Sequence, residues 1–179
     1  MDFRNAKELL KVCQEQGLSI SAVMLQRELT EGEQDPEETD RKMDRVLEIM
    51  KSAASTPIHT PVKSMGGLIG GEAKKISDHK DTGKGLCGDL LERAVIYAMA
   101  TLETNASMGV IVASPTAGSA GIVPGLLLAL QETYDLSDEQ IKQGLYNASA
   151  IGYLAMRNAT VAGAVGGCQA AVSYTHLTL

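Results

Sequence analysis

The sequence is poor in aromatic residues, which make up 3% of its 179 positions and include no tryptophan and one phenylalanine. A core without large rings has to be built from alanine, leucine, isoleucine, valine and methionine, which favours helices packed closely through small residues. Cysteine is also scarce, with Cys13, Cys87 and Cys168 and no CxxC pair. The odd count, and an N-terminus without a signal-peptide pattern, argue against a disulfide framework and indicate a cytoplasmic protein. The spacing predicts no zinc site.

Positive charge is in deficit, with 16 basic residues against 22 acidic ones and a net charge of −6. This excludes nucleic acid as the main partner, because phosphate backbones bind to basic surfaces. Charge is absent altogether from residues 106–130, a run of 25 positions that is long enough to span a bilayer. We reject a membrane span because the run is rich in glycine, proline, serine and threonine and poor in leucine and phenylalanine.

The uncharged run contains the stretch around which the chain is organised, NASMGVIVASPTAGSAGIVPG at residues 105–125. Pro115 and Pro124 argue against one continuous helix. Three glycines let the backbone approach another group closely: Gly109, Gly118 and Gly121. Thr116, Ser119 and the N–H groups around residues 117–118 can converge on a carboxylate or phosphate, ahead of an expected helix N-terminus. The alternative is tight packing in a core, and the residues alone leave both interpretations open.

Capping residues and apolar periodicity predict helices along most of the chain, and no sustained strand pattern occurs. We predict an N-terminal helical lobe (residues 1–51), a linker with two prolines (52–64), and a glycine-rich helical core (65–171). The last residues, 172–179, differ in composition from that core, and we expect a truncated or non-native tail. The predicted fold is all-α, with two packed layers of helices and glycine-rich loops clustered at one end, the active-site end.

Four motifs in order give the chain a family resemblance. They are GGLIGGEAKKI at 66–76, NASMG at 105–109, SPTAGSAGIVPG at 114–125 and VAGAVGGCQA at 161–170. Together they resemble the α chain of bacterial iron–sulfur L-serine dehydratases, over roughly residues 3–171. Several motifs in the right order are far more specific than a single glycine-rich loop.

The resemblance implies a catalytic chain that deaminates L-serine to pyruvate and ammonia with a [4Fe–4S] cluster, in an oligomer with a β chain or β domain. It implies that Cys168 is a cluster ligand. The residues that it places at the substrate are Asn105, Ser107, Thr116, Ala117, Gly118 and Ser119. The family's base belongs to a serine-rich histidine motif of the β part, which has no counterpart here, so we name no base. One cysteine cannot hold a cubane, so we expect this polypeptide to be inactive by itself.

Three alternatives accompany this hypothesis. A related iron–sulfur lyase acting on L-cysteine would carry a similar SPTAGSAG motif. A pyridoxal-phosphate dehydratase needs a Schiff-base lysine and an α/β fold, which the helical pattern opposes. A non-catalytic helical module would use the glycine-rich loops only for packing.

Overall fold

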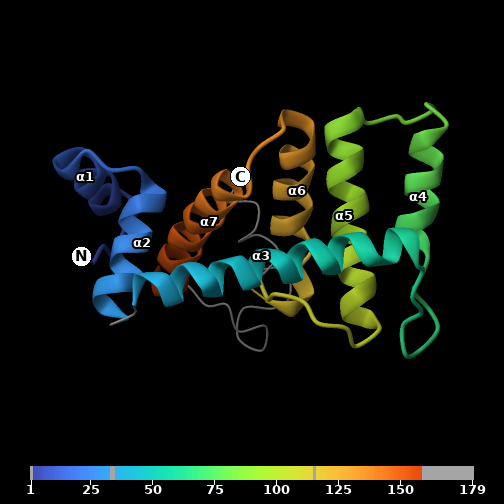
Figure 1. Cartoon of the computed structure of the whole chain (residues 1–179), viewed down its shortest axis with the longest axis horizontal. Helices are drawn as coiled ribbons and strands as arrows, with labels where there is room; N and C mark the ends of the chain where they lie inside the picture. Colours follow the sequence, from blue (N-terminus) through green and yellow to red (C-terminus); the bar gives the residue numbers. More distant parts are fainter. Residues whose placement is uncertain (1, 33–34, 115, 159–179) are drawn as a thin grey trace. The chain divides into compact units, whose positions relative to one another are not determined.

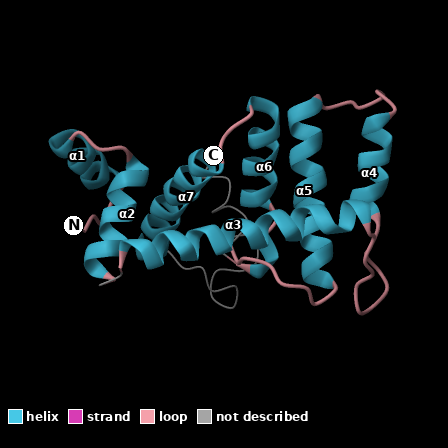
Figure 2. Cartoon of the chain, in the orientation of Figure 1, coloured by secondary structure: helices cyan, strands magenta, loops and turns pink. Residues whose placement is uncertain are grey.

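The computed structural model describes residues 2–32, 35–114 and 116–158, and every regular element in these ranges is helical (Figures 1 and 2). The all-α prediction is therefore confirmed. The elements are α1 (Ala6–Gln16), α2 (Ile20–Glu31), α3 (Pro36–His59), α4 (Glu72–Asp81), α5 (Asp89–Ala106), the short 3₁₀ helix η1 (Ala117–Ser119), α6 (Ile122–Tyr134) and α7 (Asp138–Asn158). None of the described helices combines the length and apolarity needed to cross a bilayer.

The first three helices each begin next to a residue whose side chain caps the helix. The side chains of Asn5, Ser19 and Asp35 each accept a hydrogen bond from the backbone N–H three residues later, at 2.9, 3.2 and 3.0 Å. These bonds satisfy N–H groups that have no partner inside the helix. Gly17 ends α1 in the left-handed conformation, with φ of 64°.

The chain forms two compact units whose boundaries differ from the predicted ones. One comprises residues 1–45 and 138–179, of which the structure describes 2–32, 35–45 and 138–158. The other comprises residues 46–137. The N-terminal lobe is therefore completed by α7, which comes from the far end of the described chain.

The predicted linker at residues 52–64 is wrong for its first half, because α3 continues through Pro57 to His59. A proline inside a helix leaves the carbonyl four residues earlier without its usual donor. Here that carbonyl belongs to Ala53, and the hydroxyl of Thr104 donates to it at 2.8 Å. The side chain of Thr104, which belongs to α5 and lies far along the sequence, thus replaces the missing N–H donor.

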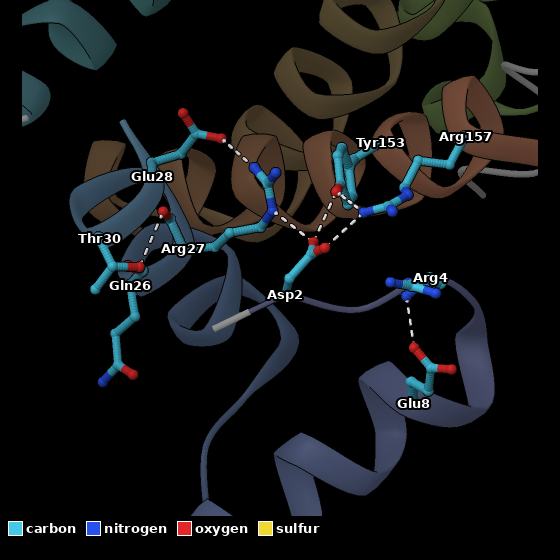
Figure 3. A network of polar contacts seen from close by, with 9 residues as sticks. All are labelled: Asp2, Arg4, Glu8, Gln26, Arg27, Glu28, Thr30, Tyr153 and Arg157. Atoms are coloured by element: carbon cyan, nitrogen blue, oxygen red, sulfur yellow. Dashed lines mark hydrogen bonds and ion pairs between the residues drawn. The ribbon is translucent and has the colours of Figure 1, made fainter. Parts of the chain in front are cut away.

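In the first unit, α2 packs against α1 and α7 around an apolar cluster. Its buried members are Phe3, Leu9, Val23, Met24, Tyr146, Ala150 and Leu154. Asp2 ties the N-terminal segment to this cluster, accepting hydrogen bonds from Tyr153 and Arg157 at 2.7 Å each (Figure 3). These bonds hold the pKa of Asp2 well below its usual range; the bond from Tyr153 contributes most, followed by the bond from Arg157. Arg27 stacks over the Tyr153 ring at 3.8 Å and extends the network to α2.

Lys142 in α7 is a nearly buried cation, 7% exposed, that pairs with carboxylates of α3 and of its own first turn. Its Nζ lies 2.6 Å from Asp40, 3.1 Å from Asp44 and 3.1 Å from Glu139. The bond to Asp40 is the main cause of a raised pKa of Lys142. The ion pairs thereby fix α7 to the N-terminal half of α3.

Replacing Lys142 by methionine keeps the apolar stem and removes the positive charge. The three carboxylates that surround it, Asp40, Asp44 and Glu139, are then left close together without their cation. Because those carboxylates remain largely in water, we expect the free energy of unfolding to fall by about 1–2 kcal/mol, below the full cost of breaking a buried pair. Urea denaturation measures the loss. Lys42→Met is the matched control, since Lys42 pairs with Glu38 and its side chain is 57% exposed. An equal loss in both variants would contradict a special role for Lys142.

In the second unit, α5 lies between α4 and α6 (Figure 1). Helices α5 and α6 approach each other closely because Gly121 and Gly125 face alanines of α5. A Cβ atom added at Gly121 would lie 2.4 Å from the Ala98 carbonyl oxygen, and one at Gly125 would lie 2.7 Å from that of Ala94. Close helix packing through small residues, expected from the scarcity of aromatic residues, is therefore present at this contact.

Candidate functional site

The C-terminal end of α5, residues 103–107, holds together two of the three glycine-rich segments. This helix begins at Asp89 and ends at Ala106, with Ser107 as its C-cap. The Ala106 carbonyl accepts a hydrogen bond from the N–H of Met65 at 3.3 Å. The Asn105 side chain donates to the Ala117 carbonyl at 3.0 Å. The third segment, residues 161–170, lies outside the described residues.

The PTAGS loop comprises residues 115–119, of which the structure describes 116–119. Hydrogen bonds of its own hydroxyl groups hold it closed. The Oγ atoms of Thr116 and Ser119 lie 3.0 Å apart, and the N–H of Thr116 donates to Ser119 at 3.3 Å. The N–H of Ser119 in turn donates to the Thr116 side chain, and the two reciprocal bonds form a capping box around η1. Ser119 is 2% exposed, so its hydroxyl shapes the loop from inside.

The backbone N–H groups of Ala117 and Gly118 have no partner among the residues that the structure describes. Both residues are exposed. Two successive free donors at the start of a helical turn can bind a small anion such as a carboxylate. Asn105 fixes them in place through the Ala117 carbonyl, and Ser107, whose hydroxyl donates to the Thr104 carbonyl at 3.0 Å, ends the neighbouring helix.

Two features of this site were not predicted. Met108 follows Ser107 with φ of 65°, a left-handed conformation that costs energy in a residue with a side chain. Glu103 is 2% exposed and binds the N–H groups of Gly71 and Ala73 at 3.1 and 2.8 Å. Neighbouring Glu72 accepts from the N–H of Gly70 at 2.6 Å, which lowers the pKa of Glu72.

A pocket of about 200 Å³ lies between α4 and α5, toward the N-terminal end of α5. Its lining residues are Ile76, His79, Lys80, Leu86, Cys87, Glu92 and Val95. None of the predicted substrate residues lines it. Cys87, for which the sequence left core and loop open, is an exposed loop residue beside this pocket.

Comparison with known proteins supplies the family. A family model described as "Serine dehydratase alpha chain" matches residues 15–175, which is most of the chain. The chain belongs to the serine dehydratase alpha chain family. The resemblance inferred from the four motifs is thereby confirmed.

Three relatives of this serine dehydratase alpha chain family member align with almost the whole chain. The chain is 43% identical over 170 residues to a probable L-serine dehydratase alpha chain of Bacillus subtilis, covering 95% of this chain and 56% of that protein. It is 38% identical over 168 residues to the L-serine dehydratase alpha chain of Peptoniphilus asaccharolyticus, covering 94% and 58%. It is 31% identical over 173 residues to L-serine dehydratase TdcG of Escherichia coli, covering 94% and 38%. The chain therefore spans little more than half the length of the two alpha chains.

The described part of this family member does not by itself fit a metal cluster. It contains no group of three or more histidine, cysteine, aspartate and glutamate side chains placed to hold a metal ion. Of its cysteines, Cys13 is half-buried in α1 and Cys87 is exposed. Cys168, the predicted ligand, lies outside the described residues. We therefore derive no catalytic step through a cluster.

Proposed function

We propose that the complete enzyme containing this chain eliminates water from L-serine and releases pyruvate and ammonia. Membership of the family supports this reaction, since the relatives carry the name L-serine dehydratase. The observation that carries the proposal concerns the N–H groups of Ala117 and Gly118, which donate to none of the described residues and are held beside the end of α5 by Asn105. Such donors suit the carboxylate of an amino acid.

In this reaction the α-proton and the β-hydroxyl of L-serine leave as water. The remaining aminoacrylate tautomerises to an imine, and a water molecule hydrolyses the imine to pyruvate and ammonia, so the atoms balance. Ala117 and Gly118 bind the substrate carboxylate through their N–H groups. Asn105 and Ser107 position the loop and the helix end, and the hydroxyls of Thr116 and Ser119 maintain the shape of the loop.

The cofactor and the partner are further parts of the proposal. Cys168 is proposed as one ligand of a [4Fe–4S] cluster, for which the resemblance implies a Lewis-acid role toward the serine hydroxyl. A cubane needs more thiolates, so the complete enzyme has to supply further ligands. The base that removes the α-proton is proposed to come from a β chain or β domain. The name "alpha chain" of the relatives from Bacillus subtilis and Peptoniphilus asaccharolyticus supports a second component.

Pyruvate release by the native enzyme, purified without oxygen, tests the proposal. We expect pyruvate and ammonia from L-serine in equal amounts. Chelation of iron should lower turnover by at least about 100-fold if the metal supplies the Lewis acid, and anaerobic reconstitution should restore it. Preferred release of sulfide from L-cysteine would instead identify a cysteine lyase. An aldimine absorption band would overturn the mechanism, and binding of L-serine without turnover would leave only a binding module.

A further inference from the structure

Glu103 is a carboxylate buried in the second unit without a cationic partner. It is 2% exposed, and no basic side chain among the described residues forms an ion pair with it. Its two oxygens accept hydrogen bonds from the backbone instead, Oε1 from Ala73 at 2.8 Å and Oε2 from Gly71 at 3.1 Å. These N–H groups belong to the first turn of α4, where the helix dipole favours a negative charge.

The consequence for α4 is that the N–H groups at its N-terminus are already occupied by an internal carboxyl group. Gly71 and Ala73 are both buried, and their N–H groups are used by Glu103. A substrate carboxylate therefore cannot bind at this helix start without displacing an internal one. The free donors of residues 117–118 are the alternative at the same end of α5.

The glycine-rich loop that precedes α4, residues 64–71, is attached to α5 through few contacts. It closes on itself through Ser64, whose N–H donates to the Ile69 carbonyl at 2.8 Å and whose hydroxyl accepts from the N–H of Ile69 at 3.1 Å. Within the described part of the chain, its hydrogen bonds to α5 are the one from Gly71 to Glu103 and the weaker one from Met65 to the Ala106 carbonyl at 3.3 Å. The same turn of α5 carries Asn105. Glu103 therefore determines where this loop stands relative to the residues proposed to bind L-serine.

We propose that Glu103 is a positioning residue of the serine site, which anchors the loop of residues 64–71 and the start of α4 to the end of α5. The proposal rests on the proposed function, because it assigns Glu103 to the site that binds L-serine. Glu103 acts through Gly71 and Ala73 and makes no contact with substrate.

Glu103→Gln in the native enzyme tests this role. The amide oxygen can accept only one of the two backbone bonds comfortably, while the amide NH₂ faces the other N–H donor. We expect hydrogen exchange of the amides in residues 64–76 to accelerate at least about tenfold, with no change in α6. We expect KM for L-serine to rise about tenfold, with a smaller change in kcat.

Two control variants separate positioning from general damage. Glu92→Gln removes a carboxylate that accepts a hydrogen bond from the N–H of Cys87 at 3.1 Å, at the other end of α5. The attachment of residues 64–71 to α5 is retained in this variant, and KM should stay near that of the wild type. Ala100→Gly weakens α5 at a fully buried position and should lower the thermal midpoint without a specific change in KM.

The outcomes distinguish this proposal from the function on which it rests. If the wild-type enzyme releases no pyruvate from L-serine, the proposed function fails, and the assignment to a serine site fails with it. If L-serine is turned over, the positioning role is overturned by unchanged exchange in residues 64–76 or by a wild-type KM for Glu103→Gln. It is also overturned if Ala100→Gly raises KM as much as Glu103→Gln does.

Discussion

Replacing Gly121 by alanine is expected to lower the free energy of unfolding of the second unit by about 2–4 kcal/mol. Gly121 has φ of −82° and ψ of −23°, a conformation that alanine adopts without strain. The cost comes from contact alone, since the added Cβ would lie 2.4 Å from the Ala98 carbonyl oxygen. That oxygen is part of the backbone of α5, so α5 and α6 have to move apart. Urea denaturation of the purified chain measures the effect.

The matched control is the same substitution in the first unit, Gly152→Ala. Gly152 lies inside α7, and no atom lies within 4 Å of the position of its added Cβ. Because alanine favours a helix more than glycine does, this variant should gain about 0.5–1 kcal/mol. The two variants are thus expected to differ in sign. A stable Gly121→Ala variant would show that the close contact between α5 and α6 does not limit stability.

The close contact at Gly121 also answers part of the question that the sequence left open. Packing and ligand binding were both possible for residues 105–125, and the structure shows packing at one of its glycines. Gly121 serves packing, because it meets Ala98. At Gly118, an added Cβ would meet only the Thr116 hydroxyl, at 4.0 Å, and its N–H is free among the described residues. Glycine spacing alone could not separate these roles, because both depend on which neighbours the fold supplies.

Helix starts were predictable because their signals are local. Asn5, Ser19 and Asp35 cap helices through bonds to residues three positions away, which the sequence displays directly. Pro57 misled the prediction because its compensation is not local: the Ala53 carbonyl is satisfied by Thr104, about fifty positions along the chain. The packing of α7 against α2 is likewise not local, since α7 returns to α2 from far along the sequence.

In the candidate site, the sequence predicted the residues of the PTAGS loop but missed Glu103. A charged residue is expected at the surface unless a partner is known. The partners of Glu103 are backbone N–H groups about thirty positions earlier. Every residue except proline has such a group, so the sequence does not show which of them will bind a given side chain. The usable signal was the glycine-rich segment before α4, which allows the backbone to approach a buried carboxylate. Whether the site residues bind L-serine stays a prediction.

Replacing Ala117 by proline is expected to lower kcat/KM for L-serine about 10- to 100-fold in the native enzyme, mainly through KM. Proline removes the N–H of residue 117, and a charge-assisted hydrogen bond contributes about 1.5–3 kcal/mol. The fold should tolerate this change, because residue 117 is the first of η1, where proline is favoured. Thr116 before it has φ of −123° and ψ of 163°, the extended conformation that a following proline requires.

Ala117→Val is the control, since it has similar bulk and retains the N–H group. If the carboxylate is bound by the backbone, the valine variant should keep most of its kcat/KM and the proline variant should not. Equal losses in the two variants would show that bulk at position 117 matters and that its N–H does not. An unchanged KM in the proline variant, with an unchanged thermal midpoint, would remove residue 117 from the proposed carboxylate site. The Glu103→Gln result would remain interpretable, because the anchor at Gly71 and Ala73 does not involve the N–H of residue 117.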